Sequence, residues 1–179
     1  FKGLTLKLKA KQGTEVKAGD VLLFDKNNDE IILVSPVSGK VVEVNRGEQR
    51  RILEVVVETG NANEVINHQS KALNEYNREE IVNLLLKSGT WPFFKMRPFG
   101  IVANPSDNPR DIFISCFDSS PLAPDFDFLL NDEKDHIKAG VEILKKLTQG
   151  DVYFGLNKEN PGFFNEIEGV EKRFFKGPH

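Results

Sequence analysis

Short runs of branched apolar residues recur about every ten residues through the first sixty positions of the chain. The runs occupy residues 21–24, 31–34, 41–44 and 52–57. Turn signals rich in Gly, Asn and Asp separate them. In residues 4–8 leucine alternates with threonine or lysine, a period-2 pattern that buries one face of a strand. Strands at such regular intervals predict a compact β-barrel or sandwich in this part of the chain.

Beyond residue 60 the pattern changes from closely spaced strands to a connector and a helix. Residues 61–76 are polar and poorly periodic, as expected of a connector. Asn77, followed three residues later by Glu80, predicts a helix start, and Gly89 is a suitable residue for the position that ends that helix.

The last part of the chain alternates between strand and helix patterns. Strands are predicted at residues 111–117, 152–156 and 170–175, and a helix is predicted at 132–147. The first turn of that helix is acidic and its last turn is basic, which complements the helix dipole. This order predicts a parallel α/β sheet. The predicted division is a β domain at 1–60, a connector and helix at 61–90, and an α/β domain at 91–179.

Composition and charge exclude several classes of partner and site. The chain has 24 Lys+Arg against 27 Asp+Glu, a formal net charge of −3, and no basic tract, which argues against nucleic acid as a partner. No apolar run approaches the roughly 18–20 residues that span a bilayer as a helix. The single cysteine, Cys116, cannot form an internal disulfide, a cysteine-rich zinc site or an iron–sulfur cage within the chain.

The spacing of turn residues in the β part resembles the barrel-sandwich hybrid fold of biotinyl and lipoyl carrier domains. The resemblance rests on Gly13-x-x-Val16-x-x-Gly19-Asp20-x-Leu22, followed by Ser35-Pro36-x-Ser38-Gly39-x-Val41. Turn glycines of an unrelated small β domain are the alternative explanation. A carrier also needs a lysine at the tip of its central hairpin, where Asn28 stands here and Lys26 is displaced. The scaffold resembles a carrier, while a carrier function is disfavoured.

The proline- and phenylalanine-rich stretch at residues 88–110 carries the most information about function. It contains Trp91, three phenylalanines, Lys95 and Arg97 without a helical or strand period, which predicts an ordered loop. Apolar rings beside cations suit a flat, partly polar ligand, because the rings stack on its faces and a cation meets a carbonyl oxygen. A loop that covers a sheet edge or docks on a partner chain is the alternative, and both stay open.

An ordered series of short motifs along the whole chain resembles the NqrA family, the A subunit of the sodium-translocating NADH:quinone reductase. The motifs are Asp25-Lys26, Ser35-Pro36-x-Ser38-Gly39, Val44-Asn45-Arg46-Gly47-x-x-Arg50, Ser88-Gly89-x-Trp91, Arg97-Pro98-Phe99, Asp118-x-x-Pro121-Leu122-Ala123, Thr148-x-Gly150-x-Val152-Tyr153 and Phe175-x-Gly177-Pro178-His179. The resemblance implies a fragment that covers well under half of a full-length member. Its second domain would be Rossmann-like, similar to that of the flavin-binding subunit of respiratory complex I, and incomplete at the C-terminus.

The resemblance also implies a function. The family works in a bacterial inner-membrane complex that couples NADH oxidation to sodium export, and the NqrA subunit is peripheral, on the cytoplasmic face. Flavins and an iron–sulfur centre in other subunits carry electrons to quinone, the substrate. Expected partners are those subunits, especially the quinone-side subunit that is embedded in the membrane. The NqrA subunit would be non-catalytic and inactive as an isolated fragment.

Within the family, the loop that matches residues 94–101 lies in the region implicated in quinone interaction. The residues expected to lie near quinone are therefore Phe94, Lys95, Arg97, Pro98 and Phe99. Met96 stands where other members have a small residue, so the shape of the pocket is expected to differ.

Bulky residues argue against a cofactor bound by the chain itself. In the flavin-binding subunit of complex I and the C subunit of the Rnf complex, a glycine-rich loop stands where this chain has Trp91, Phe93 and Phe94. No G-x-G-x-x-G follows the strand predicted at 111–117, so FMN and NADH binding are disfavoured. The alternatives to a quinone-proximal role are an electron-transfer subunit of the Rnf type and a non-redox docking subunit.

The cysteine and the histidines do not suggest a catalytic or metal site. Cys116 lies inside an apolar strand and is expected to be a small buried hydrophobic residue rather than a nucleophile. His68, His136 and His179 are far apart in the sequence, so no metal site is expected from them.

The serines and aspartates after the strand at 111–117 favour turns over chemistry. Ser119 and Ser120 lack the G-x-S-x-G elbow of a nucleophile, and Asp118-x-x-Pro121 is typical of a turn. The acidic and aromatic residues at 125–128 are expected to form a solvated loop rather than an ion site.

Overall fold

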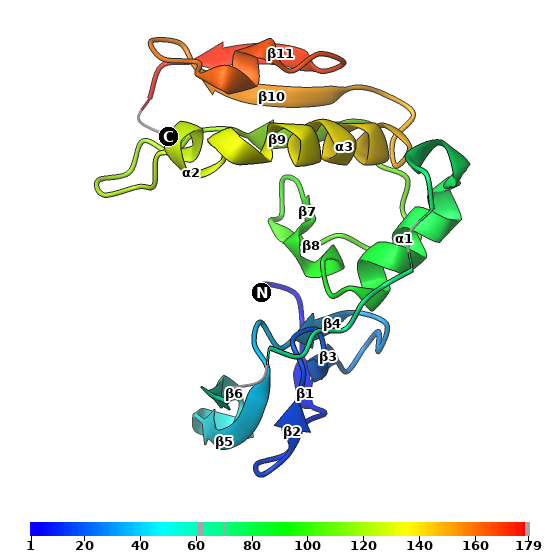
Figure 1. Ribbon diagram of the computed structural model, residues 1–179, viewed down its shortest axis with the longest axis vertical. Coiled ribbons are helices and arrows are strands. Elements are labelled where there is room, and N and C mark those ends of the chain that lie inside the picture. Colours follow the sequence, from blue (N-terminus) through cyan, green and yellow to red (C-terminus); the bar gives the residue numbers. More distant parts are fainter. Residues whose placement is uncertain (61–62, 70, 178–179) are drawn as a thin grey trace. The chain divides into compact units, whose positions relative to one another are not determined.

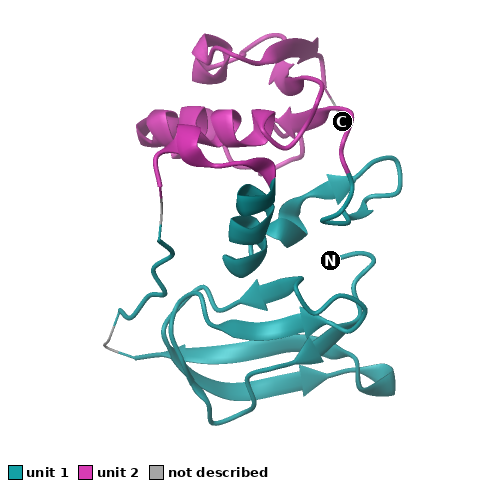
Figure 2. Cartoon of the chain, turned by 90° about the vertical axis from the view of Figure 1, so that its right-hand side faces the viewer, with its two compact units in different colours: residues 1–70, 79–107 teal, residues 71–78, 108–179 magenta. Residues whose placement is uncertain are grey.

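The computed structural model describes residues 1–60, 63–69 and 71–177. Two compact units make up the chain, and Figure 2 colours them separately. Unit 1 comprises Phe1–Ser70 and Glu79–Asp107, and unit 2 comprises Lys71–Arg78 and Asn108–His179. Figure 1 gives the order of the elements along the chain. Of the sequence motifs, Pro178 and His179 lie outside the described residues.

Two three-stranded antiparallel sheets form the β part of unit 1. One has the order β1-β3-β4, with β1 at Leu6–Leu8, β3 at Val21–Asp25 and β4 at Ile32–Val34. The other has the order β2-β5-β6, with β2 at Glu15–Val16, β5 at Gly39–Arg46 and β6 at Ile52–Thr59. The 3₁₀ turn η1 (Glu48–Arg50) connects β5 to β6. Ala10, Val16, Leu22 and Val41 form the buried core. The predicted sandwich of short strands is confirmed.

The hairpin between β3 and β4 has its turn at the position of a carrier lysine. Asp25, at the end of β3, is 3% exposed. Its carboxylate accepts hydrogen bonds from the backbone N–H of Thr5 at 2.6 Å and of Asn28 at 3.2 Å. The backbone N–H of Ile31 donates to the carbonyl of Asn28 at 3.1 Å. Asn28 therefore lies in the turn, as the spacing predicts, with a side chain that offers no amine for attachment of biotin or lipoate.

Helix α1 and a short hairpin complete unit 1. α1 spans Arg78–Lys87, begins directly after Asn77 as predicted, and buries Ile81, Val82 and Leu86. The 3₁₀ turn η3 (Trp91–Phe93) follows, and β7 (Lys95–Met96) pairs antiparallel with β8 (Ile101–Val102). The segment predicted as a loop thus contains short regular elements. The sequence does not reveal them, because strands of two residues are too short to show a sequence period.

Unit 1 continues past the predicted start of the α/β domain at residue 91, since residues 79–107 group with the β part. The two units group residues that are close in space, whereas the predicted domains are defined by sequence patterns, so the two divisions need not coincide. The division into 1–60, 61–90 and 91–179 stays a prediction.

Three parallel strands in the order β11-β10-β9 form the sheet of unit 2. β9 spans Ile112–Ser115, β10 spans Val152–Asn157 and β11 spans Glu171–Phe175. The 3₁₀ turn η2 (Leu73–Glu75) also belongs to this unit. Helix α3 (Lys134–Lys145) and the 3₁₀ turn η5 (Phe163–Glu166) pack against one face. The core there contains Val141, Phe154, Leu156, Phe163, Phe164 and Ile167. The predicted parallel α/β arrangement is confirmed.

The helix predicted at 132–147 is shorter than expected, and the segment before it is helical. α3 begins at Lys134, after α2 (Phe126–Leu129) and the 3₁₀ turn η4 (Asn131–Glu133). The solvated loop predicted at 125–128 is wrong, because the Asp125 carboxylate accepts hydrogen bonds from two backbone N–H groups and caps α2. A helix of one turn is too short to show a helical period in the sequence. Within the described residues, no helix has the length and apolar character needed to cross a bilayer.

Candidate functional site

A glycine at the end of α1 turns the chain toward the aromatic residues at 91–94. Gly89 has φ +71°, and a Cβ there would lie 2.7 Å from Cγ1 of Val34. A residue with a side chain would meet both backbone strain and this collision. The backbone N–H of Gly89 donates to the carbonyl of Leu86 at 3.0 Å. The prediction that Gly89 ends the helix is confirmed, and Trp91 follows two residues later.

Trp91 is a core residue of unit 1 and not an exposed ring. It is 5% exposed, and its indole Nε1–H donates to the carbonyl of Ala103 at 2.8 Å. Its ring stacks on that of Phe94, with the ring centroids 5.2 Å apart. Pro92 is also buried. Trp91 and Pro92 therefore form the base on which the neighbouring residues are held.

The hairpin formed by β7 and β8 carries four of the five predicted quinone-proximal residues on its strands and turn. Lys95 lies on β7, and Arg97, Pro98 and Phe99 form the turn, in which the Arg97–Pro98 peptide bond is cis. The backbone N–H of Gly100 closes the turn by donating to the carbonyl of Met96 at 2.8 Å. Phe94, the fifth residue, precedes β7 and is turned toward Trp91. The structure therefore places four of the five residues in one hairpin and Phe94 directly before it.

Lys95 is already engaged by its own neighbours. Its ammonium Nζ donates to the carbonyl of Pro92 at 2.7 Å and lies 4.5 Å from the centroid of the Phe1 ring. Partial burial lowers the pKa of the Lys95 ammonium, because desolvation disfavours its charged form. A ligand would have to replace these contacts to bind this cation.

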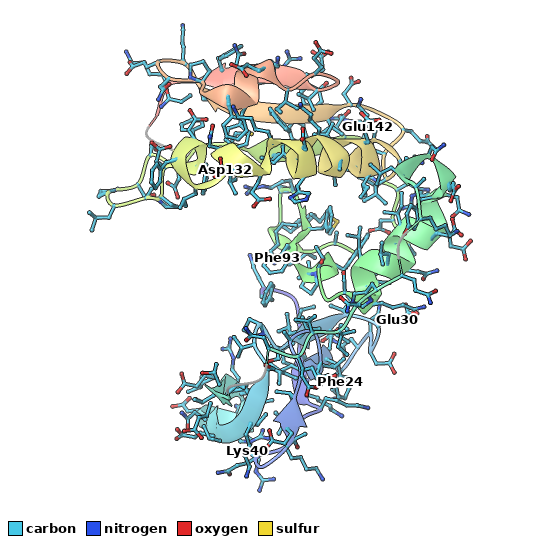
Figure 3. All side chains as sticks on the ribbon, viewed as in Figure 1. Phe24, Glu30, Lys40, Phe93, Asp132 and Glu142 are labelled. Carbon is cyan, nitrogen blue, oxygen red and sulfur yellow. The ribbon has the colours of Figure 1, made fainter. Side chains whose placement is uncertain are left out.

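Arg97 and the flanking rings remain open to solvent. Phe99 is 62% exposed in the turn. Phe93, which is labelled in Figure 3, is 69% exposed just before the hairpin. Within the described residues, the Arg97 guanidinium has no hydrogen bond or ion pair. The guanidinium therefore keeps its five N–H donors available in a segment that also carries two exposed apolar rings. A cation and apolar rings in one segment suit the recognition of a flat, partly polar molecule.

The sequence reasoning missed the contribution of the first residues of the chain. The Phe1 ring packs edge-on against Phe93, with centroids 5.7 Å apart, and Lys2 Nζ donates to the carbonyl of Phe99 at 3.0 Å. The backbone N–H of Val102 donates to the carbonyl of Lys2 at 3.2 Å. No local pattern in the sequence signals these contacts, because they join positions about one hundred residues apart.

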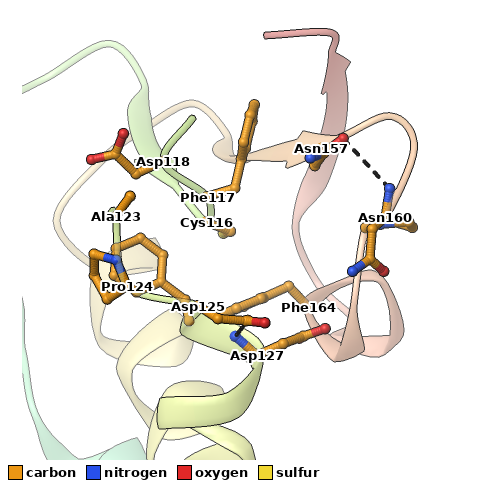
Figure 4. A pocket seen from close by; sticks show the side chains of 12 residues that line it. Cys116, Phe117, Asp118, Ala123, Pro124, Asp125, Asp127, Asn157, Asn160 and Phe164 are labelled. Atoms are coloured by element: carbon orange, nitrogen blue, oxygen red, sulfur yellow. Dashed lines mark hydrogen bonds between the residues drawn. The ribbon is translucent and has the colours of Figure 1, made fainter. Parts of the chain in front are cut away.

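A second candidate lies in unit 2, where the carboxyl ends of β9 and β10 open into a crevice of about 230 Å³. Open α/β sheets generally bind ligands at this edge. Figure 4 shows the residues that line this crevice: Cys116, Phe117, Asp118, Ala123, Pro124, Asp125, Phe126, Asp127, Asn157, Asn160, Pro161 and Phe164.

The polar groups of the crevice are largely used by the fold itself. Asp125 Oδ1 accepts from the backbone N–H of Asp127 at 2.9 Å, and Asp127 Oδ1 accepts from that of Phe163 at 2.9 Å. Asn157 Oδ1 accepts from the backbone N–H of Asn160 at 3.4 Å, the dashed line in Figure 4. Together with Asp118, these residues place three carboxyl groups in the crevice. Such a surface repels phosphate, whereas dinucleotide sites present backbone N–H groups to it.

Two further sequence predictions concern Cys116 and Asp118. Cys116 is 7% exposed, and burial raises the pKa of its thiol to about 12, so the burial predicted from the sequence is confirmed. The turn predicted after β9 is also confirmed, since Asp118 Oδ1 accepts from the backbone N–H of Ser120 at 2.8 Å and Ala123 N–H donates to the Ser120 carbonyl at 3.0 Å.

The two histidines that the structure describes belong to different units. His136 pairs with Glu133 at the start of α3, and this hydrogen bond raises the pKa of the imidazole, while His68 is exposed in unit 1. His179 lies outside the described residues. Across residues 1–60, 63–69 and 71–177, no group of three or more His, Cys, Asp or Glu side chains is arranged to hold a metal ion.

Two family models match the chain. Residues 1–60 match the NqrA N-terminal barrel-sandwich hybrid domain, and residues 76–179 match the NqrA second alpha/beta domain. The fold class expected from the sequence, a barrel-sandwich hybrid followed by an α/β domain, is confirmed by these matches and by the two units.

Curated relatives match the chain along its whole length. The relative from Vibrio atlanticus (strain LGP32), named as the A subunit of the Na(+)-translocating NADH-quinone reductase, is 36% identical over 183 residues. Relatives of the same name from Aliivibrio salmonicida and Photorhabdus laumondii are 35% and 31% identical. In each case the match covers 100% of this chain and 40% of the relative, so the chain spans well under half the length of these relatives.

Proposed function

The chain belongs to the NqrA family, and from that premise we propose that it works as part of the NqrA subunit in a sodium-translocating NADH:quinone reductase. Relatives that carry this subunit name support the proposal. The chain is peripheral, on the cytoplasmic face of the membrane, and docks on the quinone-side subunit that is embedded in the membrane. Flavins and an iron–sulfur centre in other subunits move the electrons from NADH, and the chain itself binds neither.

The hairpin formed by β7 and β8 supplies one wall of the site where quinone is reduced. A quinone headgroup is flat and apolar on its faces and carries two carbonyl oxygens. The exposed rings of Phe93 and Phe99 match the apolar faces. When quinone accepts electrons, negative charge develops on its oxygens, and a guanidinium with N–H donors directed at that charge stabilises it.

Arg97 provides these donors, and Lys95 has a supporting part. The observation that carries the proposal is that the Arg97 guanidinium has no partner among the described residues, whereas Lys95 already donates to Pro92 and lies over the Phe1 ring. Arg97 loses only water when a quinone oxygen approaches. Lys95, Phe94 and Pro98 hold the shape of the hairpin that presents Arg97 and Phe99.

The test is Arg97→Ala in the complete reductase, with Arg51→Ala as a matched control in unit 1. Arg51 is exposed and carries the same charge, and its substitution should leave all activities unchanged. Removing a donor to a developing oxyanion typically costs ~10²–10³-fold in turnover in a closed site, so a loss of about tenfold is expected at this more open one. NADH-to-flavin reduction should stay intact, because no electron carrier is touched.

Two results would contradict the proposal. Unchanged quinone reduction in Arg97→Ala would remove Arg97 from the site. A smaller amount of the NqrA subunit in the purified complex, with normal turnover per complex, would assign the hairpin to docking instead.

A further inference from the structure

The turn that follows β9 holds a leucine in a backbone conformation that leucine rarely adopts. The backbone N–H of Ala123 donates to the carbonyl of Ser120 at 3.0 Å, so residues 120–123 form a β-turn with Pro121 and Leu122 at its centre. Leu122 has φ +64°. Proline followed by a residue with positive φ is the pattern of a type II turn, in which glycine or asparagine normally takes the second central position. A leucine at this position is strained.

The fold of unit 2 gives no reason for a leucine in this turn. The Leu122 side chain is 104% exposed, more than any other large hydrophobic side chain that the structure describes. It is not among the residues that form or line the core of unit 2. A single exposed leucine is normal on a protein surface, but one that also carries backbone strain points to a role outside the fold.

Two more apolar side chains of the same segment point away from the core. Phe126, at the start of α2, and Leu130, directly after it, pack against the core of unit 2. Residues four apart share one side of a helix, so Phe128 and Leu129 lie on another side. Phe128 is 83% exposed and Leu129 is 57% exposed. Large apolar side chains are therefore presented to solvent at both ends of the stretch 122–129.

The same segment carries only negative charge. Residues 112–133 contain five acidic residues and no lysine or arginine, although the chain as a whole has 24 Lys+Arg against 27 Asp+Glu. The five are Asp118, Asp125, Asp127, Asp132 and Glu133. Ala123, the neighbour of Leu122, lines the crevice of unit 2 together with the first three of them (Figure 4). Carboxyl groups therefore lie beside the base of the exposed leucine.

Apolar side chains with a polar rim are typical of surfaces that bind another protein. The sign of the rim selects among the possible occupants. Anionic lipid headgroups are repelled by carboxylates, and a second copy of the chain that met this segment with its own would bring the same negative charge. A protein surface with lysine and arginine side chains around an apolar pocket is complementary in both respects.

We infer that residues 118–130 form a docking surface for a partner protein, and that Leu122 enters an apolar pocket of that partner which is rimmed by basic side chains. The inference rests on the proposed function in one respect, because it takes the partner to be another subunit of the reductase. The strained turn holds the leucine in one direction before binding. Little ordering is then needed when the partner arrives, which favours association.

The test uses two substitutions that relieve the strain while they remove the apolar side chain. Glycine and asparagine adopt positive φ more readily than leucine, so Leu122→Gly and Leu122→Asn should keep the Tm of the 179-residue chain at or above the wild-type value. Leu53→Asn is the control, since Leu53 is 66% exposed on β6 in unit 1. A leucine that served the fold would give the opposite result, a lower Tm in both Leu122 variants.

Binding is measured by titrating the NqrA subunit with each substitution against reductase prepared without that subunit. Kd should rise at least about tenfold for Leu122→Gly and Leu122→Asn, because a leucine side chain is lost from an apolar pocket, and should stay unchanged for Leu53→Asn. Raising the ionic strength should weaken the wild-type association, because salt screens the attraction between the acidic rim and a basic one. Quinone reduction per assembled complex should not change, which separates this surface from the role of Arg97.

A cross-linking amino acid identifies what covers the leucine. Benzoylphenylalanine at position 122 should cross-link to another subunit when the assembled reductase is irradiated, and the same group at position 53 should not. A cross-link only within the same polypeptide, to a second copy or to lipid would overturn the inference.

Three other results would also overturn it: an unchanged Kd in the Leu122 variants, a Tm that falls in both of them, and a wild-type association that is insensitive to ionic strength. If the wild-type subunit itself failed to bind the reductase, the proposed function would fail and this inference with it. Comparison of the wild type with the variants therefore distinguishes the two failures.

Discussion

The hairpin of unit 1 and the crevice of unit 2 use their polar atoms in opposite ways. In the crevice, Asp125, Asp127 and Asn157 accept hydrogen bonds from the backbone of their own unit. In the hairpin, the Arg97 guanidinium, in the same turn as Phe99, has no partner among the described residues. A ligand in the crevice meets carboxyl groups that already accept hydrogen bonds from the backbone, whereas a ligand at Arg97 displaces only water. The location where open α/β sheets usually bind ligands is therefore the weaker candidate here.

The largest expected effect concerns the base that holds the hairpin. Trp91→Ala should lower the free energy of unfolding by about 3–5 kcal/mol, because it removes a buried ring and leaves the Ala103 carbonyl without its donor. Phe93→Ala is the matched control, since Phe93 is 69% exposed and its loss should cost less than about 1 kcal/mol. Urea unfolding of both variants gives the comparison. Similar losses would show that the exposed ring is structural and not available to a ligand.

A smaller effect tests whether the crevice carboxylates serve the fold. Asp125→Ala should cost about 1 kcal/mol, because the two backbone N–H groups at the start of α2 lose their acceptor. Asp125→Asn keeps a side-chain oxygen at the cap and should stay close to the wild type in thermal unfolding. If Asp125→Ala were as stable as the wild type, the carboxylate would be free for a ligand, and the contrast with the hairpin would fail.

The smallest effect is a pH dependence at the start of α3 in unit 2. The hydrogen bond to Glu133 raises the pKa of His136 above its ordinary value of 6.5. Because the folded pKa is the higher one, the stabilisation is fully present below pH 6.5 and is lost as the pH rises through the folded pKa. The pair is exposed, so the effect is small and is screened by salt. The Tm of wild type and His136→Gln should differ slightly at pH 5.5 and converge by about pH 8.5. A difference that persists at high pH would contradict the assignment.

The sequence predicts the parts of the fold that rest on local patterns. The strands of unit 1, the parallel strands of unit 2, the end of α1 at Gly89 and the burial of Cys116 all follow from periodicity or from a residue's conformational needs. The one-turn helix at 126–129 does not, since four residues show no period and only the Asp125 cap marks its start.

The candidate site could be predicted only in part. The sequence places Phe94, Lys95, Arg97, Pro98 and Phe99 in one segment, and the structure places all but Phe94 in one hairpin. The sequence does not reveal that the Lys95 ammonium contacts the Pro92 carbonyl and the Phe1 ring, whereas the Arg97 guanidinium has no partner among the described residues. That distinction depends on the first residues of the chain lying beside β8, a contact between positions far apart in sequence, which no local pattern encodes.

Photolabelling of the assembled reductase with a photoreactive quinone analogue, followed by peptide mapping, tests the hairpin most directly. Label should appear on the peptide that contains residues 91–103 and should disappear when excess quinone competes. Label confined to the crevice segments at 116–127 and 157–164, or to other subunits alone, would contradict a role of the hairpin in the quinone site.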